Sequence, residues 1–432
     1  MENLAVNDIS FTEENIKRVT LRNHANKVGA VDMCLNPHNN EEIRVASVSE
    51  DGKLYIYDIN RNDILENKKV KECIILVLLP SFHPKKEKKT ILSSFNSQNF
   101  FFCLQNIINS QWVTTLNLHK RNDLVACGGL DNTVSIYLFA GRNASTRHPW
   151  RRINKAKWHI QFVEFFSDGT NRICCGGSGS ALLYVFDYWT SECLAAIDCG
   201  QTALADARLC QDKSKCLFVT GEGTIQFLRF GASGAGSDSN MQYKHLQTIC
   251  GEAGNKFGRI CISPNDKYLA CGGNGKGNCC IYEFQNDCTQ LSQLDLSAIG
   301  PSCEEGITDV CWVNDLCCVF SLKDKRTTSL LGVEIIRYCE SKVFIDALMQ
   351  CLHSIDRVQL HVKTDLCRHL CTLILHMCGH HFRHFEISSP HTSKVTCLAA
   401  SVLHTFGASL MASGGDDSRV CVCMWNKNKS IL

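Results

Sequence analysis

The stretch LVACGGLDNTVSIYLF, residues Leu124–Phe139, decides the fold of this chain. It reads as two strand-like runs with alternating apolar residues, joined by a tight Gly/Asp turn, which is the signature of a β-hairpin. The same shape recurs along the chain at Arg44–Asp58, Ile173–Asp187, Leu269–Phe284 and Met411–Asn426. Because one hairpin cannot bury its apolar faces alone, this recurrence predicts an array of similar units packed side by side.

The spacing of these units predicts an all-β fold, a seven-bladed β-propeller. The second small residue before each turn marks the units at Ser47, Cys127, Cys175, Thr220, Cys271 and Ser413, which lie 80, 48, 45, 51 and 142 residues apart. Four-stranded propeller blades repeat every ~40–45 residues, so each middle gap fits one blade. The last gap leaves room for one unmarked blade, for which Gly306–Trp312 followed by Cys317–Ser321 is the candidate.

Three segments do not follow the repeat. Residues 1–22 are polar and form a short N-terminal segment, with a helix expected over Phe11–Arg22, and the propeller is expected over residues 23–432. Two long irregular insertions, at about residues 70–110 and 333–388, lack blade periodicity. Such an insertion could act as a functional lid, but we favour poorly packed insertions, for example translated introns.

Composition excludes several classes of protein. The chain has 45 basic and 43 acidic residues, so bulk charge indicates no nucleic-acid partner. Many of its 28 cysteines sit inside strand-like runs, where they act as small apolar residues rather than as a disulfide framework. The N-terminus lacks a signal-peptide core, and the longest apolar run, Cys73–Pro80, is too short to span a bilayer. We therefore expect a cytoplasmic protein.

No motif argues for catalysis or for a cofactor. The segment Cys367–His384 is dense in Cys and His, a metal-ligand composition, but its spacing fits no standard zinc pattern. No nucleophile–base pair or carboxylate pair stands out, so we expect no enzyme, no bound metal and no cofactor. An enzyme-associated or metal-binding role of residues 333–390 is the least favoured alternative.

Several stretches together resemble one family. They are similar to the first two blades and the last blade of the β subunit of heterotrimeric G proteins, a seven-bladed WD40 propeller. The resemblance covers most of residues 20–427 outside the insertions. It is carried by Thr20–Val28, Ser49–Asp58, Gln111–Thr115, Val125–Tyr137, His391–Leu398 and Ala412–Trp425.

The resemblance implies structural marks in these blades. In WD40 blades a His, a Ser or Thr, a turn Asp and a Trp form a hydrogen-bonded set. The last blade carries the full set, whereas the first has Tyr57 in place of Trp and the second keeps its turn Asp. The matching residues are His391, Ser413, Asp417 and Trp425, then His24, Ser47 and Asp51, then Asp131.

The resemblance also implies a function. The family's β subunit is a non-enzymatic adaptor that binds Gα on one propeller face, pairs with Gγ through an N-terminal helix longer than residues 1–22, and connects receptors to effectors. Membrane contact is then indirect, as a peripheral complex at the inner face of the plasma membrane. The alternative is a general WD40 scaffold without G-protein partners. The residues that match the Gα-binding face are Lys27, Trp112, Thr114, Leu130 and Lys69, with Trp112 alternatively a core residue at a strand start.

Overall fold

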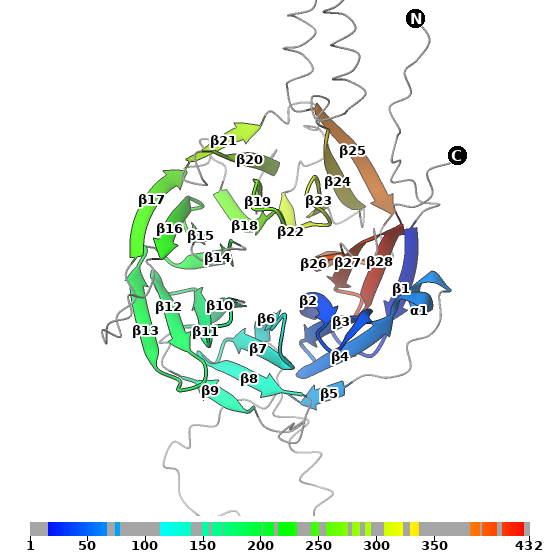
Figure 1. Cartoon of the computed structure of the whole chain (residues 1–432), viewed down its shortest axis with the longest axis horizontal. Coiled ribbons are helices and arrows are strands. Elements are labelled where there is room, and N and C mark those ends of the chain that lie inside the picture. Colours follow the sequence, from blue (N-terminus) through cyan, green and yellow to red (C-terminus); the bar gives the residue numbers. More distant parts are fainter. Residues whose placement is uncertain are drawn as a thin grey trace, which may run out of the picture.

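Seven four-stranded sheets stand in a ring around a central opening (Figure 1). Each sheet is an antiparallel meander, and the sequence-based prediction of a seven-bladed all-β propeller is confirmed. The computed structural model describes residues 16–66, 74–77, 113–139, 149–154, 158–166, 168–200, 202–210, 215–230, 243–249, 256–274, 279–285, 290–294, 306–322, 329–336, 381–388, 391–403 and 408–426.

The blades are numbered in chain order, and the strands of each blade are given from the innermost to the outermost. Blade 1 is β2 (Val28–Asn36), β3 (Asn39–Ser49), β4 (Lys53–Asn60) and β5 (Ile74–Val77), with the short helix α1 (Arg61–Leu65) between β4 and β5. Blade 2 is β6 (Val113–Leu118), β7 (Leu124–Gly129), β8 (Val134–Leu138) and β9 (Arg151–Ile153). Blade 3 is β10 (Ile160–Phe165), β11 (Arg172–Gly177), β12 (Leu182–Asp187) and β13 (Cys193–Asp198).

The later blades follow the same plan. Blade 4 is β14 (Leu204–Leu209), β15 (Lys215–Thr220), β16 (Ile225–Phe230) and β17 (Tyr243–Ile249). Blade 5 is β18 (Lys256–Ile262), β19 (Tyr268–Asn274), β20 (Cys279–Gln285) and β21 (Gln290–Leu294). Blade 6 is β22 (Ile307–Trp312), β23 (Cys317–Leu322), β24 (Ser329–Ile336) and β25 (His381–Ser388). Blade 7 is β26 (Val395–Leu403), β27 (Ala408–Gly415), β28 (Val420–Asn426) and β1 (Ile16–Leu21).

The core lies between blades, because each sheet is covered on both faces by its neighbours. In the hairpin β7–β8, Val125 and Cys127 pack in a cluster shared with blade 1. Leu124 and Ala126 point to the other side and pack in a cluster shared with blade 3. This two-sided burial explains why the hairpin is apolar at nearly every position rather than at every second one.

The ring is closed by pairing the two ends of the chain. Strand β1 pairs antiparallel with β28, from Ile16 opposite Trp425 to Leu21 opposite Val420, and the two strands lie side by side in Figure 1. The helix expected over Phe11–Arg22 is therefore wrong for residues 16–21, and the propeller begins before residue 23. The β-branched Val19 is buried in this strand, where it packs in the cluster shared by blades 7 and 1.

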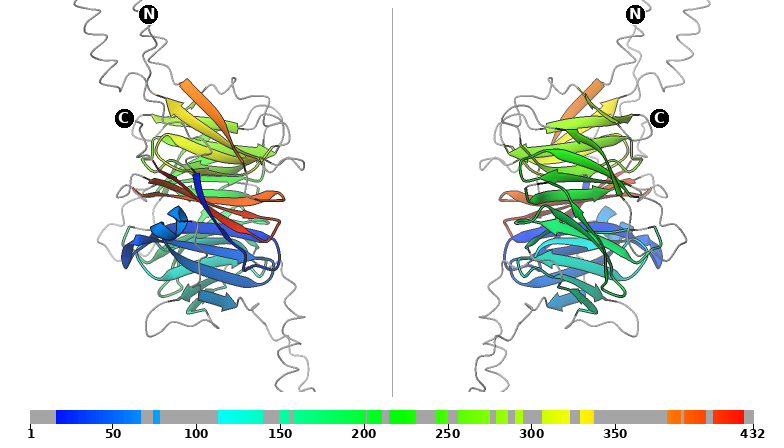
Figure 2. Two further views of the ribbon diagram at one scale, coloured as in Figure 1. Left: turned by 90° about the vertical axis from the view of Figure 1, so that its right-hand side faces the viewer. Right: turned by 90° about the vertical axis from the view of Figure 1, so that its left-hand side faces the viewer.

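The edges of both insertions belong to blades. Ile74–Val77 is the outer strand of blade 1, although its continuous apolar run showed no blade periodicity. Ser329–Ile336 and His381–Ser388 pair over their full length as the outer strands of blade 6. The unmarked blade expected near Gly306–Trp312 is confirmed as this sheet. In the side views of Figure 2 the blades lie side by side around the ring.

Candidate partner-binding face

One face of the ring collects two kinds of connection, the loops that lead into the innermost strands and the turns between the second and third strands. We call this the hairpin face. Backbone hydrogen bonds tie the two kinds together: the amide of Glu50 donates to the carbonyl of Lys27 at 3.0 Å, and the amide of Asp416 donates to the carbonyl of Lys394 at 2.9 Å. Side chains from neighbouring connections therefore meet on this face.

Two matching hydrogen-bonded sets anchor the hairpin face. In blade 7, His391 Nδ1 lies 2.8 Å from the Asp417 carboxylate, and its Nε2 lies 2.9 Å from Ser413 Oγ. The Asp417 carboxylate also accepts the amide of Thr392 at 2.9 Å. Since a carboxylate only accepts, Nδ1 of His391 donates to Asp417, and Nε2 forms the second hydrogen bond of the ring with the Ser413 hydroxyl.

Blade 1 repeats this arrangement. His24 Nδ1 lies 3.2 Å from Asp51 Oδ2, and His24 Nε2 lies 2.8 Å from Ser47 Oγ. The amides of Ala25 and Lys53 each donate to Asp51 at 3.0 Å. Burial alone would raise the pKa of Asp51, but the hydrogen bonds from His24 and the amides outweigh it and hold that pKa below its usual range. The same balance lowers the pKa of Asp417.

These sets have the Ser–His–Asp connectivity of a hydrolase triad, but they lack access. Ser47 and Ser413 are both fully buried, at 0% exposure, so no substrate carbonyl can reach either hydroxyl. A nucleophile must meet its substrate at about 3 Å. The two sets therefore hold turns in place rather than form a reactive centre.

The remaining structural marks, Asp131 and Trp425, make contacts in blade 2 and in the cluster between blades 6 and 7. The Asp131 carboxylate accepts the amide of Thr133 at 3.2 Å and its hydroxyl at 2.6 Å, which caps the turn of the opening hairpin. Trp425 lies in β28 and is 3% exposed within the cluster between blades 6 and 7. Both residues therefore lie where the resemblance implied, in a hairpin turn and in the third strand of the last blade.

Lys27 lies on the hairpin face at the junction of blades 7 and 1. Its side chain is exposed, and its Nζ lies 3.6 Å from Asp416 Oδ1, in the turn of the last blade. Because both side chains are about 40% exposed, this ion pair contributes little to stability. The pair instead places one positive and one negative group on the surface.

Leu130 lies on the same face, in the turn of the opening hairpin, and is half-buried. Its carbonyl accepts a hydrogen bond from Nδ1 of exposed His159 at 2.6 Å, which joins the turn of blade 2 to the loop entering blade 3. Since a carbonyl oxygen only accepts, Nδ1 of His159 is the donor in this hydrogen bond.

Trp158 is the most exposed aromatic side chain among the described residues of the hairpin face, at 47%. It lies against the turn of blade 3, where a Cβ on Gly179 would be 2.9 Å from Trp158 Cε3. Gly179 has φ +91°, a backbone conformation that favours glycine. The absence of a side chain at this position also leaves space for the indole of Trp158. The sequence analysis did not single out Trp158, since an isolated Trp in a loop carries no spacing signal.

Thr114 is placed differently from the other matched residues. It is the extra residue of a β-bulge between Val113 and Thr115, and its hydroxyl donates to the carbonyl of Ile160 in blade 3 at 2.5 Å. Thr396 uses the equivalent bulge of blade 7 to reach the carbonyl of Val28 at 2.6 Å. Thr114 therefore joins two blades, rather than standing free on the hairpin face.

Two matched residues, Trp112 and Lys69, lie outside the described residues, and so does most of the Cys/His segment from Cys367 to His380. Where the structure does describe side chains, no three His, Cys, Asp or Glu residues come together as a cation site. The described part of the chain also holds no helix long and apolar enough to cross a bilayer.

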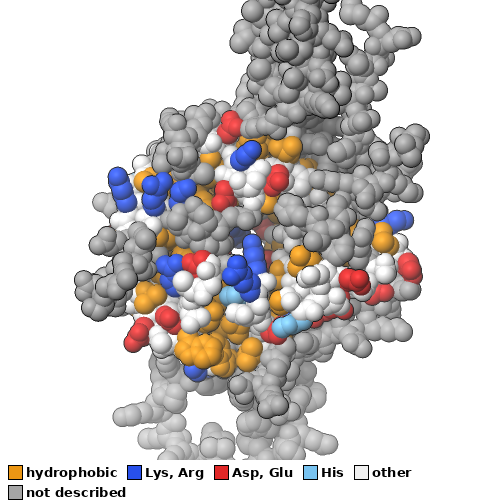
Figure 3. All heavy atoms as spheres, viewed as in Figure 1, with side chains coloured by type: hydrophobic (Ala, Val, Ile, Leu, Met, Phe, Trp, Pro, Cys, Tyr) orange, Lys and Arg blue, Asp and Glu red, His pale blue; other side chains and the backbone are white. Residues whose placement is uncertain are grey.

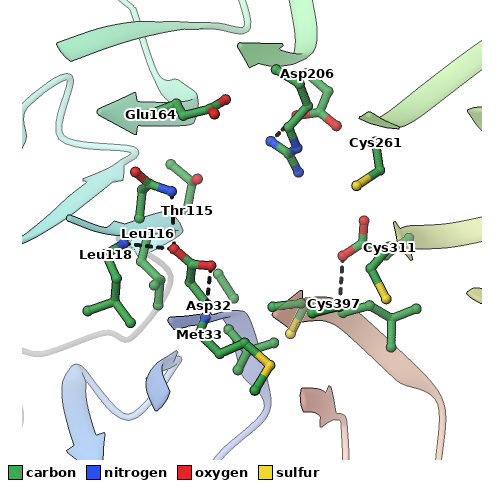
Figure 4. A pocket seen from close by; sticks show the side chains of 18 of the residues that line it. Asp32, Met33, Thr115, Leu116, Leu118, Glu164, Asp206, Cys261, Cys311 and Cys397 are labelled. Carbon is green, nitrogen blue, oxygen red and sulfur yellow. Dashed lines mark hydrogen bonds and ion pairs between the residues drawn. The ribbon is translucent and has the colours of Figure 1, made fainter. Parts of the chain in front are cut away.

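The centre of the ring holds a cavity of about 520 Å³. Figure 3 shows its mouth at the middle of the ring, with Lys and Arg side chains beside it. In Figure 4, Asp32, Glu164, Asp206 and Cys311 surround the same space from different blades. This arrangement brings acidic groups from several blades around one space.

The carboxylates around the cavity are engaged by backbone amides. Asp32 accepts the amide of Leu118 in blade 2 at 2.7 Å, and Asp309 accepts the amide of Leu398 in blade 7 at 2.7 Å. Burial raises the pKa of Asp32 to about 6 against the lowering effect of these amides, and it also raises the pKa of Asp309.

Hydrogen bonds between a side chain of one blade and the backbone of the next form a belt around the ring, with one at every junction between blades. We call them the belt contacts. They are Asp32 to Leu118, Asn117 to Phe165, Glu164 to Leu209, Asp206 to Ile260, Trp312 to Cys261, Asp309 to Leu398 and Thr396 to Val28. The cavity wall is therefore primarily structural.

Comparison with protein-family models matches two stretches of this chain, residues 101–137 and 383–423, to the family described as WD domain, G-beta repeat. The first ends in the opening hairpin, and the second runs from β25 through most of β28. A search of the curated proteins finds no match to the chain. Together with the seven sheets, these repeats indicate a WD40 protein, a propeller of the kind that acts as a protein-interaction scaffold.

Proposed function

We propose that this chain, a seven-bladed propeller with WD40 repeats, is a non-enzymatic adaptor that resembles a G-protein β subunit. In this proposal it binds a Gα subunit through the hairpin face. The observation that carries the proposal is the group formed by Leu130, His159 and Trp158 at the junction of blades 2 and 3. Trp158 is 47% exposed yet held in place by the turn at Gly179.

This group has the composition of an interface centre. Tryptophan dominates binding hot spots, because a large rigid side chain buries much area at a small entropic cost. Half-buried Leu130 adds an apolar neighbour, and His159 adds a polar nitrogen at the rim. Lys27 and Asp416 supply exposed charges of both signs elsewhere on the same face, which would orient a partner.

The finer parts of the proposal rest on the resemblance. Trp112 and Lys69 stay predicted contacts of the partner, and pairing with a Gγ chain stays a prediction as well. Attachment to the inner face of the plasma membrane would then follow through the assembled complex, and receptors or effectors would be further partners. A cytoplasmic location is part of the same proposal.

Co-purification tests the proposal directly. Full-length protein is co-expressed with Gγ chains and passed over immobilised Gα·GDP, together with Trp158→Ala, Leu130→Asp and the control Tyr243→Ala. Tyr243 is a matched exposed aromatic residue, at 46%, on the outer strand of blade 4. We expect Trp158→Ala to weaken Gα binding at least tenfold, about 1.4 kcal/mol. Absence of binding to both Gα and Gγ by the wild type would end the G-protein assignment.

A general scaffold without G-protein partners is the second candidate. It is favoured by the ion pair of Lys27, since the lysine that the resemblance assigns to Gα already faces Asp416. Asp416→Ala separates the two candidates. If Lys27 serves Gα, freeing it should strengthen Gα binding, whereas a general scaffold should show no Gα binding with or without Asp416.

A further inference from the structure

The face opposite the hairpin face carries an aromatic group that the proposed function does not use. Trp150 lies just before β9 in blade 2, and Trp189 lies in the turn between β12 and β13 of blade 3. Their rings meet edge to face with centroids 4.9 Å apart, and the Arg151 guanidinium lies 4.7 Å from the centre of the Trp150 ring. We call these three residues the Trp–Arg cluster.

The cluster spans two blades and is partly exposed, because Trp150 and Arg151 are half-buried and Trp189 is exposed. Trp189 is 56% exposed, the highest value among the large apolar side chains that the structure describes as exposed. Arg151 Nε donates to the carbonyl of Trp189 at 3.2 Å, so the guanidinium holds the two blades' side chains in one arrangement. On the face seen in Figure 3, hydrophobic side chains gather near β8 and β9. A pre-arranged pair of tryptophans, one of them exposed, together with an arginine has the composition of a binding hot spot.

The polar atoms of the cluster are all donors. Indole and guanidinium groups donate hydrogen bonds and accept none. Within the part of the chain that the structure describes, Arg151 contacts two backbone carbonyls and the Trp150 ring but makes no ion pair with a carboxylate. Its charge is therefore not neutralised by a described acidic group. A complementary ligand must bring acceptors, a negative charge and an apolar body.

We propose that the Trp–Arg cluster binds a short acidic peptide segment of a partner protein, one that combines Asp or Glu with aromatic or aliphatic side chains. The carboxylate pairs with Arg151, because a guanidinium fork matches a carboxylate in a bidentate fashion. The apolar side chain covers the exposed face of Trp189. This surface is separate from the hairpin face, so the propeller can hold two partners at once.

A membrane surface is the main alternative ligand, since Trp and Arg also gather at lipid interfaces. Anionic membranes are bound by clusters of about four to eight basic side chains. The cluster has one arginine, followed by Arg152, on a chain with a formal net charge of only +2. This small positive charge therefore favours a peptide over a membrane surface.

Peptide display on the full-length protein tests the proposal. A random peptide library is selected on the wild type and on Trp189→Ala, Arg151→Glu and the control Tyr243→Ala. Enriched peptides are synthesised, and their affinities are measured by fluorescence polarisation. We expect enrichment of peptides that carry both acidic and apolar residues. Their affinity should fall at least tenfold with Trp189→Ala, fall further with Arg151→Glu, and stay within twofold with Tyr243→Ala.

The contrary results are equally clear. Peptides whose binding ignores both Trp189 and Arg151, or dependent peptides that are basic or uncharged, would overturn the proposal. So would Trp189-dependent binding of phosphatidylserine vesicles without any peptide binding. Should Trp189→Ala melt well below the wild type, Arg151→Gln carries the test, because it removes the charge while retaining a polar side chain. The acidic peptide must then lose affinity while the melting temperature stays near that of the wild type.

Discussion

Replacing Asp417 by alanine should destabilise the propeller by about 3 kcal/mol. The substitution removes the acceptor of two short hydrogen bonds, from His391 Nδ1 at 2.8 Å and from the Thr392 amide at 2.9 Å. Hydrogen bonds to a charged group contribute ~1.5–3 kcal/mol each, and an orphaned buried donor costs ~1–3 kcal/mol. His391 is 3% exposed, so its ring nitrogen finds no solvent, whereas exposed Thr392 regains water. These opposing terms leave a net loss of about 3 kcal/mol.

The assay is equilibrium urea unfolding, followed by tryptophan fluorescence and circular dichroism. Asp51→Ala in the matching set of blade 1 should cost a similar amount. Asp131→Ala should cost less, because the Thr133 amide and hydroxyl that donate to Asp131 lie in the same turn, whereas Asp417 ties its turn to His391 and Thr392 in another segment. A double-mutant cycle of His391→Ala with Asp417→Ala should show a coupling of about 1–3 kcal/mol.

The pH dependence gives an independent check. The hydrogen bonds hold the folded pKa of Asp417 below its unfolded value, so its stabilising effect is present above the unfolded value and is lost as pH falls through the folded one. The difference between wild type and Asp417→Ala should thus stay constant near neutrality and shrink below about pH 4. A loss no larger than that of Asp131→Ala at pH 7 would refute the reasoning.

Three further predictions concern other parts of the ring. Burial raises the folded pKa of Asp32 to about 6, so wild-type stability relative to Asp32→Asn should be highest below pH 4 and fall as pH rises through 6, measured by urea midpoints at several pH values; a difference that rises with pH contradicts this. Gly177→Ala should cost about 3 kcal/mol, since a Cβ there would lie 1.9 Å from the His159 carbonyl oxygen, whereas Gly258→Ala, with nothing within 4 Å, should be nearly neutral in the same unfolding assay; equal costs would count against it. Brief iodoacetamide labelling with peptide mapping should modify exposed Cys193 before buried Cys175, whose pKa burial raises to about 12, and the reverse order would be inconsistent with the structure.

The hairpin marks predicted the blades well, because their turn chemistry is local. The pair Gly128-Gly129 and the turn at Asp131 need only their neighbours to specify a hairpin, and even the unmarked blade near Gly306 followed from the spacing. Strand β1 was missed because its partner β28 lies about 400 residues away, and no local pattern reveals such a partner. Ile74–Val77 was missed because two-sided burial hides the alternation of an isolated short strand.

The candidate sites show the same division. Lys27 and Leu130 were matched by resemblance and lie on one face, but the hydroxyl of Thr114 bonds to the next blade, which depends on a bulge that sequence does not show. The sequence does not show that Trp158 and Trp189 are exposed, because exposure depends on how the blades pack. The belt contacts were missed as well, since Asp32 and Asp309 look like ordinary strand residues until neighbouring blades are placed.

The pairing of β1 with β28 also sets the order in which this protein can be completed during synthesis. The ribosome makes Ile16–Leu21 about 400 residues before Val420–Asn426, and among the described strands β1 pairs with β28 alone. Until β28 has been made, β1 has no partner strand, and the blades already formed remain an open arc. Such an arc can recruit strands from a neighbouring nascent chain. The yield of closed propellers will therefore depend on the distance between ribosomes on one messenger RNA. It will also depend on any factor that binds residues 16–21 before β28 is made.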